Sequence, residues 1–262
     1  MSNALKLYEQ SEIAALDPQS EAALAFRENN EGSSFDVSDL IRVKVPSAGG
    51  TIWTIEGPAG KESVDEIQGV IVFKAPHGLI WRSEDISPGE KPVVVSNDLV
   101  TGKLNVPREE VPTEMIETLD ANEVPGHPGV YDWAKLPYTQ WGTGKKGIGK
   151  YAKEQIMLFI LRPNELLPLF IAVPPGSIKN MKKFFLQASI QYYRMVISLK
   201  LKEEISKGKI KYSQIIPTHV GTISAEDGKK ICEMYRDPLK KKHEAGLIEL
   251  DHSMDSADSA EE

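Results

Sequence analysis

The sequence contains a single cysteine, Cys232, among its 262 residues. One thiol cannot form an internal disulfide, and it cannot supply a zinc site of the CxxC…CxxC type. A reducing cytoplasm suits such a chain. The five histidines are scattered without metal-ligand spacing, and no Ser/His/Asp or Cys/His arrangement suggests nucleophilic catalysis. We therefore expect no metal, no other cofactor and no enzymatic activity, and we expect Cys232 to be a small core residue of a helix.

Long apolar runs are also missing. No stretch approaches the roughly 20 apolar residues that a membrane-spanning helix needs. Residues 1–17 are acidic and lack the continuous apolar centre of a signal peptide. We expect a soluble, cytoplasmic protein without a membrane partner.

Basic residues are scarce in the first half of the chain and absent from its end. Residues 1–141 carry a net charge of −12, residues 142–250 carry +10, and residues 251–262 carry −5 with no Lys or Arg. A basic region flanked by acidic ones indicates a polyanionic partner, of which nucleic acid is the most common. Residues 251–262 also hold almost nothing apolar, so we predict a disordered acidic tail.

Alternating apolar and polar residues follow residue 39 and predict β-structure. Four or five short strands are expected between residues 40 and 98, with turn signals at roughly 10-residue spacing, which is typical of a small barrel or sandwich. Residues 154–162 and 167–175 are strongly apolar and predict core strands. Residues 194–202 and 209–224 predict a further strand pair.

Two helices are expected in the second half of the chain. Ser177 can cap a helix over residues 177–193, and Ser224 with Asp227 can cap a final helix over residues 225–246.

These elements predict a β-rich α+β fold, best described as an elaborated OB-like five-stranded barrel with one or two helices and long loops. Other β-barrels fit nearly as well. We expect a flexible lead-in over residues 1–38, a single OB-like nucleic-acid-binding domain over residues 39–250, and the tail over 251–262. Residues 100–150 are rich in proline and glycine and have little periodicity, so they predict a long irregular insertion.

The segment most informative about function is residues 133–153, WAKLPYTQWGTGKKGIGKYAK. It interleaves aromatic residues and lysines with the glycines of residues 142–150, which we call the glycine–lysine loop. Lysines can follow the phosphates of a single strand while aromatic faces stack on its bases, each contributing on the order of 1–3 kcal/mol. The alternative is a solvated loop whose tryptophans dock on the barrel.

Further lysines at positions 179, 182 and 183 are expected to form an ordinary solvated helix face unless they share a surface with the loop. The residues we expect to contact nucleic acid are Trp141, Lys145, Lys146, Lys150, Tyr151, Lys153, Arg194 and Lys200.

The same loop matches part of a nucleotide-binding motif. Residues 144–150 fit the pattern GxxxxGK of phosphate-binding loops. The next residue is Tyr151, where Ser or Thr is needed to bind Mg²⁺, and an apolar, strand-like run follows where a helix should begin. Nucleotide hydrolysis is therefore the weaker interpretation.

The order of several motifs resembles a family of phage single-stranded-DNA-binding proteins. SNDLVTG at residues 96–102, the glycine–lysine loop, the apolar strand after it and LPLFIAVPPGSIKN at residues 167–180 occur in that family's order. GVIVFKAPHGLIW resembles its early strands. The resemblance covers roughly residues 65–225 and implies an OB-type fold, single-strand binding and, if a phage encodes the chain, the host cytoplasm.

One departure from the family pattern concerns zinc. Many such sequences carry cysteines before and within the loop, whereas here those neighbourhoods offer Val95, Tyr131, Trp141 and Tyr151. The usual cysteine and zinc positions are lost, and aromatic packing is expected to hold the loop instead.

The leading hypothesis is sequence-tolerant binding of single-stranded DNA during phage-type DNA replication or recombination. The acidic tail would compete for the basic groove and recruit replication or recombination proteins. Two alternatives stay open: a nucleotide-binding enzyme that uses the GxxxxGK-like loop, and a structural or adaptor protein with no affinity for DNA.

Overall fold

The computed structural model describes residues 6–8, 13, 17, 20–29, 37–57, 60–87, 89–163, 165–206, 209–245 and 248. The predicted tail, 251–262, and much of the lead-in, 1–38, lie outside the described residues. By their internal contacts, Met1–Lys74 and Ile156–Ile248 form one compact unit, and Ala75–Gln155 belong to a second unit.

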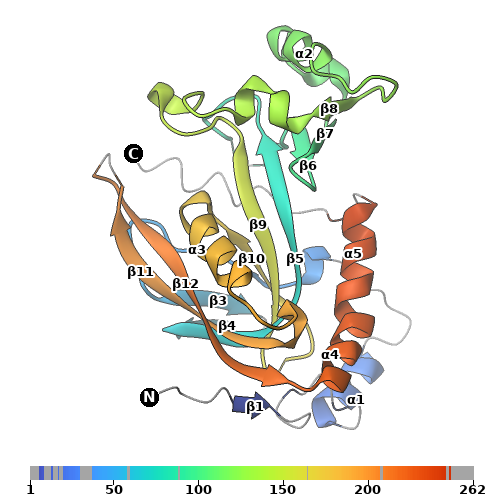
Figure 1. Cartoon of the computed structure of the whole chain (residues 1–262), viewed down its shortest axis with the longest axis vertical. Coiled ribbons are helices and arrows are strands. Elements are labelled where there is room, and N and C mark those ends of the chain that lie inside the picture. Colours follow the sequence, from blue (N-terminus) through green and yellow to red (C-terminus); the bar gives the residue numbers. More distant parts are fainter. Residues whose placement is uncertain are drawn as a thin grey trace. The chain divides into compact units, whose positions relative to one another are not determined.

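The first unit is a mixed β-sheet with helices (Figure 1). Its strands are β1 (Lys6–Tyr8), β2 (Arg42–Val43), β3 (Trp53–Gly57), β4 (Gly60–Val64), most of β5 (Glu66–Ile80), most of β9 (Lys153–Leu161), β10 (Leu169–Val173), β11 (Met195–Ile205) and β12 (Lys211–Ile223). Its helices are α1 (Glu21–Asn29), α3 (Pro175–Leu186), α4 (Ala225–Ile231), a π-helix over Cys232–Arg236, α5 (Asp237–Glu244) and two 3-10 turns, Val37–Asp39 and Tyr192–Arg194.

The sheet of the first unit runs β1-β12-β11-β5-β9-β10-β2. Two of its pairings, β1 with β12 and β10 with β2, are parallel, whereas β11 pairs antiparallel with β12 and β5. The strands β3 and β4 form a separate hairpin. Among the described strands, β1 and β2 each pair with a single neighbour, so this sheet does not close on itself. The β-rich α+β class is therefore confirmed, and the predicted OB-like five-stranded barrel is corrected to an open sheet.

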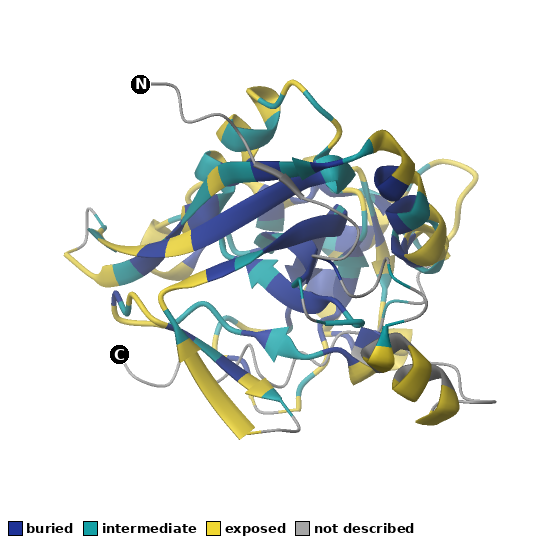
Figure 2. Cartoon of the chain, turned by 90° about the horizontal axis from the view of Figure 1, so that it is seen from below, coloured by how far each residue is buried: buried dark blue, intermediate teal, exposed yellow. Residues whose placement is uncertain are grey.

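Burial explains why the apolar strands form the core. Val43, Trp53, Ile71, Leu158 and Ile197 are among the residues of one buried cluster in the first unit. Figure 2 shows that the buried residues concentrate on the strands, while the hairpin ends and the outer helix faces are exposed. Burying each such aliphatic or aromatic side chain completely stabilises the folded state by about 1.5–3 kcal/mol.

The two expected helices exist, with altered bounds. The helix α3 begins two residues earlier than predicted, at Pro175, and ends at Leu186. Ser177 is not its cap: it is buried and its Oγ accepts the Ile215 N–H (2.9 Å). The second cap is confirmed, since the Asp227 N–H donates to Ser224 Oγ (3.0 Å). The last helix is interrupted by the π-helix, which directly precedes Asp237 and Pro238, and proline has no N–H to donate. Within this segment Cys232 is buried, as predicted.

The second unit gives structure to the predicted insertion. It contains the strands β6 (Val94–Ser96), β7 (Thr101–Leu104) and β8 (Val130–Asp132), and the helix α2 (Thr113–Asp120). The end of β5 pairs with β6, β6 with β7, and β7 with β8, all antiparallel. Four 3-10 turns cover Arg108–Glu110, Trp133–Lys135, Pro137–Thr139 and Lys145–Gly147. A core of its own includes Val94, Met115, Leu119, Tyr131 and Trp133.

Candidate nucleic-acid interface

The glycine–lysine loop lies in the second unit, between the Pro137–Thr139 turn and β9. Backbone hydrogen bonds close it on itself: the Gly142 N–H donates to the Gly149 carbonyl (2.6 Å), and the Gly147 N–H donates to the Gly144 carbonyl (2.8 Å). Such a closed set of bonds satisfies several backbone groups within the loop and fixes its backbone.

Glycine is required at several points of this loop for two physical reasons. Gly142, Gly147 and Gly149 have φ values of +89°, +74° and +72°, a region that other residues adopt only with strain. At Gly144 the limit is space, because a Cβ would lie 2.3 Å from the Ile148 carbonyl oxygen. Lys146 itself holds φ +57°, which costs roughly 1–2 kcal/mol. Strained backbone of this kind clusters at functional sites.

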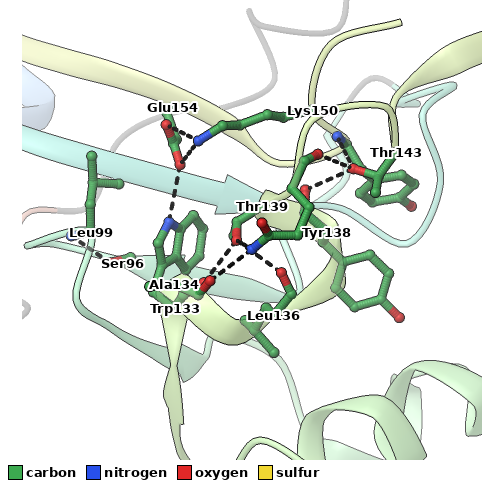
Figure 3. Close-up of polar contacts among 12 residues, drawn as sticks. Ser96, Leu99, Trp133, Ala134, Leu136, Tyr138, Thr139, Thr143, Lys150 and Glu154 are labelled. Atoms are coloured by element: carbon green, nitrogen blue, oxygen red, sulfur yellow. Dashed lines mark hydrogen bonds and ion pairs between the residues drawn. The ribbon is translucent and has the colours of Figure 1, made fainter. Parts of the chain in front are cut away.

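Thr143 ties the loop to the segments on both sides of it. Its hydroxyl donates to the Gln140 carbonyl (2.7 Å) and accepts the Tyr151 N–H (3.1 Å) (Figure 3). The Ala152 N–H donates to the Tyr138 carbonyl (2.8 Å). The two ends of the loop are therefore held together.

Tyr151, one of the predicted contacts, is a structural residue of the loop. Its hydroxyl donates to the Trp81 carbonyl (3.0 Å), and its ring lies 5.2 Å from that of Tyr138. Burial raises the pKa of Tyr151 to about 12, with nearby Tyr138 and carboxylates adding to the effect. The hydroxyl therefore stays protonated at neutral pH and keeps donating. Aromatic packing supports the loop here, as the sequence predicted.

The aromatic residues of the segment divide into buried and exposed ones. Trp133 is 1% exposed, and its Nε1 donates to Glu154 Oε1 (3.3 Å), so it is core and cannot stack on a base. Trp141, by contrast, is 81% exposed. Ile148, which the sequence reasoning missed, is 73% exposed. Trp141 and Ile148 each precede one residue of the Gly142–Gly149 hydrogen bond, so two large exposed apolar side chains belong to the closed loop.

The lysines differ in how firmly they are held. Lys150 Nζ contacts both oxygens of Glu154 (2.9 Å each), and these side chains are only 27% and 22% exposed (Figure 3). Lys145 forms a pair with Asp85 (2.8 Å) in which both side chains are well exposed. Lys146 is exposed and makes no ion pair with any residue that the structure describes. Lys153 is the first residue of β9 and is half-buried.

The remaining two predicted contacts belong to the first unit and have partners there. Arg194 donates to the Ile223 carbonyl through two nitrogens (3.4 Å each), and its side chain packs against Gly228. Lys200 Nζ lies 3.5 Å from Glu66 Oε2. Arg194 therefore has a structural role, and Lys200 is an exposed, paired cation.

The GxxxxGK-like pattern leads into β9 rather than into a helix. No helix N-terminus therefore follows Lys150 to hold a phosphate, as a phosphate-binding loop requires.

Two absences hold for the part of the chain that the structure describes. Its His, Cys, Asp and Glu residues form no group of three that could hold a metal ion. Its helices include none that is long and apolar enough to cross a membrane.

No protein-family model, curated protein or solved structure matches this chain.

Proposed function

We propose that this protein binds single-stranded DNA, with little dependence on sequence, through Trp141 and the glycine–lysine loop. The observation that carries the proposal is the exposure of Trp141 (81%) and Ile148 (73%) on a backbone fixed by hydrogen bonds. Folding gains little from apolar side chains left in water, so their placement supports a role in binding. Bases offer apolar faces that fit such side chains.

A fixed loop also favours affinity. Each base stacked on an aromatic ring contributes on the order of 1–3 kcal/mol to the free energy of binding. A loop that is already ordered loses less conformational entropy when it binds. The bonds of Thr143 and of the loop glycines therefore support stacking on Trp141.

The loop's charges support phosphate binding to different degrees. Among the residues that the structure describes, Lys146 has no ion pair that a phosphate would have to break. An exposed ion pair such as Lys145–Asp85 contributes only about 0–1 kcal/mol to stability. A phosphate can therefore replace Asp85 beside Lys145. Lys150 is held by the half-buried Glu154, so we assign it chiefly to loop structure.

The wider role belongs to the same proposal. The leading hypothesis from the sequence adds binding during phage-type replication or recombination and no enzymatic activity, and the family resemblance implies an OB-like strand arrangement. The acidic tail, 251–262, is proposed to compete for the basic surface and to recruit partner proteins.

Fluorescence titration with oligo-dT tests the proposal directly. Trp53, Trp81 and Trp133 are buried, so Trp141 is expected to dominate any quenching by stacked bases. Trp141→Ala should weaken oligo-dT binding, measured by anisotropy of a labelled oligonucleotide, by about 1–3 kcal/mol, or roughly 5- to 150-fold. Trp141→Phe should restore most of the affinity because it keeps a stacking face.

Val100→Ala is a matched control, since Val100 is an exposed apolar residue (64%) of the same unit outside the loop. Its affinity should equal that of the wild type. Parallel titrations with duplex DNA and RNA measure the preference for single-stranded DNA. A wild-type protein that does not bind oligo-dT even at low salt would refute the proposed function.

A further inference from the structure

The helix α3 is oriented by polar contacts with the strand β12. β12 pairs with β11 along its length, but with β1 only over Gly221–Ile223. Part of its other edge is covered by α3: the Ile215 N–H donates to Ser177 Oγ (2.9 Å), and the Ile215 carbonyl accepts from Asn180 Nδ2 (3.2 Å). Figure 1 shows α3 beside β12 within this unit. These contacts fix which side of α3 faces water.

Three lysines lie on the opposite side of α3. Lys179, Lys182 and Lys183 are exposed, and their spacing of three and four residues places them on one helix face. α3 contains no acidic residue, and none of the three makes an ion pair with a described residue. Like charges at this spacing repel and destabilise a helix. Leu186 extends the same face and is 86% exposed.

Three lysines of the neighbouring β11–β12 hairpin, by contrast, lie near carboxylates. Lys202 and Lys211 contact Glu204 (2.6 Å) and Glu203 (3.0 Å), and Lys200 lies near Glu66 (3.5 Å). Within the described residues, the same unit therefore neutralises these lysines of the hairpin and leaves those of α3 uncompensated.

A fourth cation lies beside the same helix. Lys74 is half-buried, and its Nζ lies 4.6 Å from the ring centroid of Phe185, on α3, and 5.3 Å from that of Tyr192. Its neighbours are aromatic faces, and it makes no ion pair with a described residue. Phe184 stacks edge-to-face on Phe185, with centroids 5.4 Å apart, and both rings are partly exposed. Cations interleaved with aromatic rings are typical of single-strand binding surfaces.

We infer that this surface, which we call the α3 face (Lys179, Lys182 and Lys183), binds the phosphate backbone of a nucleic acid. The inference rests on the proposed function and adds a second contact surface, in the first unit, that is separate in sequence from the glycine–lysine loop. A polyanion would relieve the repulsion among the helix lysines and release its own counterions.

The test measures how oligo-dT affinity of the full chain depends on salt. In single-strand binding, each neutralised phosphate changes the slope of log K against log salt by about 0.7. The triple variant Lys179→Ala, Lys182→Ala, Lys183→Ala should therefore lower the slope by about 2 and weaken binding at least about tenfold at low salt. The corresponding triple Lys→Arg variant should keep the wild-type slope. Thermal melting of each variant checks that it folds.

The matched control removes three exposed lysines that do have carboxylate partners: Lys211→Ala, Lys229→Ala and Lys240→Ala. Its salt slope should stay close to the wild-type value. If Trp141→Ala weakens binding while the α3 triple variant keeps both affinity and slope, the α3 inference is wrong and the proposed function stands. If the wild type does not bind oligo-dT, the proposed function itself fails. Self-association that the α3 variant abolishes, without a change in DNA affinity, would assign the face to a second copy of the chain and overturn the inference.

Discussion

Trp53 and Trp141 occupy opposite environments. Trp53, in the first unit, is fully buried in the sheet core, and its Nε1 donates to the Leu199 carbonyl (2.9 Å). Trp141, in the second unit, is 81% exposed at a loop that hydrogen bonds and glycines hold closed. The core of the first unit depends on apolar burial, whereas the region around Trp141 depends on individual polar contacts and on backbone geometry.

This difference separates the requirements of folding from those of binding. A buried tryptophan is accounted for by the stability that it provides. An exposed one contributes little to stability, and the role that we propose for Trp141 is in binding. Variants of the two regions should therefore have opposite effects on stability and on affinity.

Replacing the buried tryptophan should give the largest effect on stability. Trp53→Ala leaves a cavity in the core and removes the donor that satisfies the Leu199 carbonyl. We expect a loss of about 3–5 kcal/mol in the free energy of unfolding, measured by urea denaturation. Trp141→Ala, treated identically, should lose less than about 0.5 kcal/mol, as exposed substitutions do. Equal losses would show that the two tryptophans are not in contrasting environments.

A substitution inside the loop should affect both properties moderately. Gly144→Ala places a Cβ 2.3 Å from the Ile148 carbonyl oxygen, a backbone atom that cannot move without changing the loop. We expect a loss of about 1–3 kcal/mol in stability. Oligo-dT affinity should fall as well, because the clash displaces Ile148 and changes the loop backbone that carries Trp141.

Gly126→Ala separates these two effects. Gly126 has φ +78° and open space around its Cβ position, so alanine there is strained by about 1–2 kcal/mol without any clash. It lies in the same unit but outside the loop. The two variants should lose comparable stability, and only Gly144→Ala should weaken binding. A similar loss of affinity in both would mean that general destabilisation, rather than loop geometry, controls binding.

The sequence was sufficient to predict elements whose pattern is local. Alternation predicted β11, and Ser224 with Asp227 marked the start of α4. It could not predict that the sheet stays open, because the partners of short strands such as β1 and β2 are set by contacts distant in sequence. The helix α2 was missed among prolines, although Met115 and Leu119 have helical spacing.

The candidate site was predicted as a segment, but not residue by residue. The mixture of lysine, glycine and aromatic residues marked the loop. Whether a lysine is available depends on its carboxylate partner: Glu154 holds Lys150, and this contact follows only from the fold. Exposure has the same limit, since Trp133 and Trp141 look equivalent in sequence and differ in burial. Ile148 could have been noticed as a lone apolar residue between glycines.

The smallest expected effect concerns another polar element of the second unit, the turn at Asp98. The limited burial of Asp98 alone would raise its pKa, but hydrogen bonds from the backbone N–H groups of Thr101 (2.7 Å) and Val100 (2.8 Å), and from side-chain hydroxyls, hold the pKa below its usual value. A carboxylate with a lowered pKa stabilises the fold above the unfolded-state pKa, near about 3.9, and this contribution is lost as the pH falls through the folded-state value.

Asp98→Asn should therefore lower the melting temperature slightly at pH 7, by no more than about 2 °C because the side chain is exposed and screened. The difference between the variant and the wild type should disappear as the pH approaches about 2, in melting curves recorded across this range.

A buried aliphatic residue of the first unit supplies the matched control for this pH dependence. Ile71 lies in the core of that unit and carries no titratable group, so Ile71→Val should lower stability equally at both ends of the pH range. A difference for Asp98→Asn that persists unchanged at the acidic end would mean that the turn does not depend on the charge of this carboxylate. Polar contacts and apolar burial would then stabilise the two regions in the same pH-independent way.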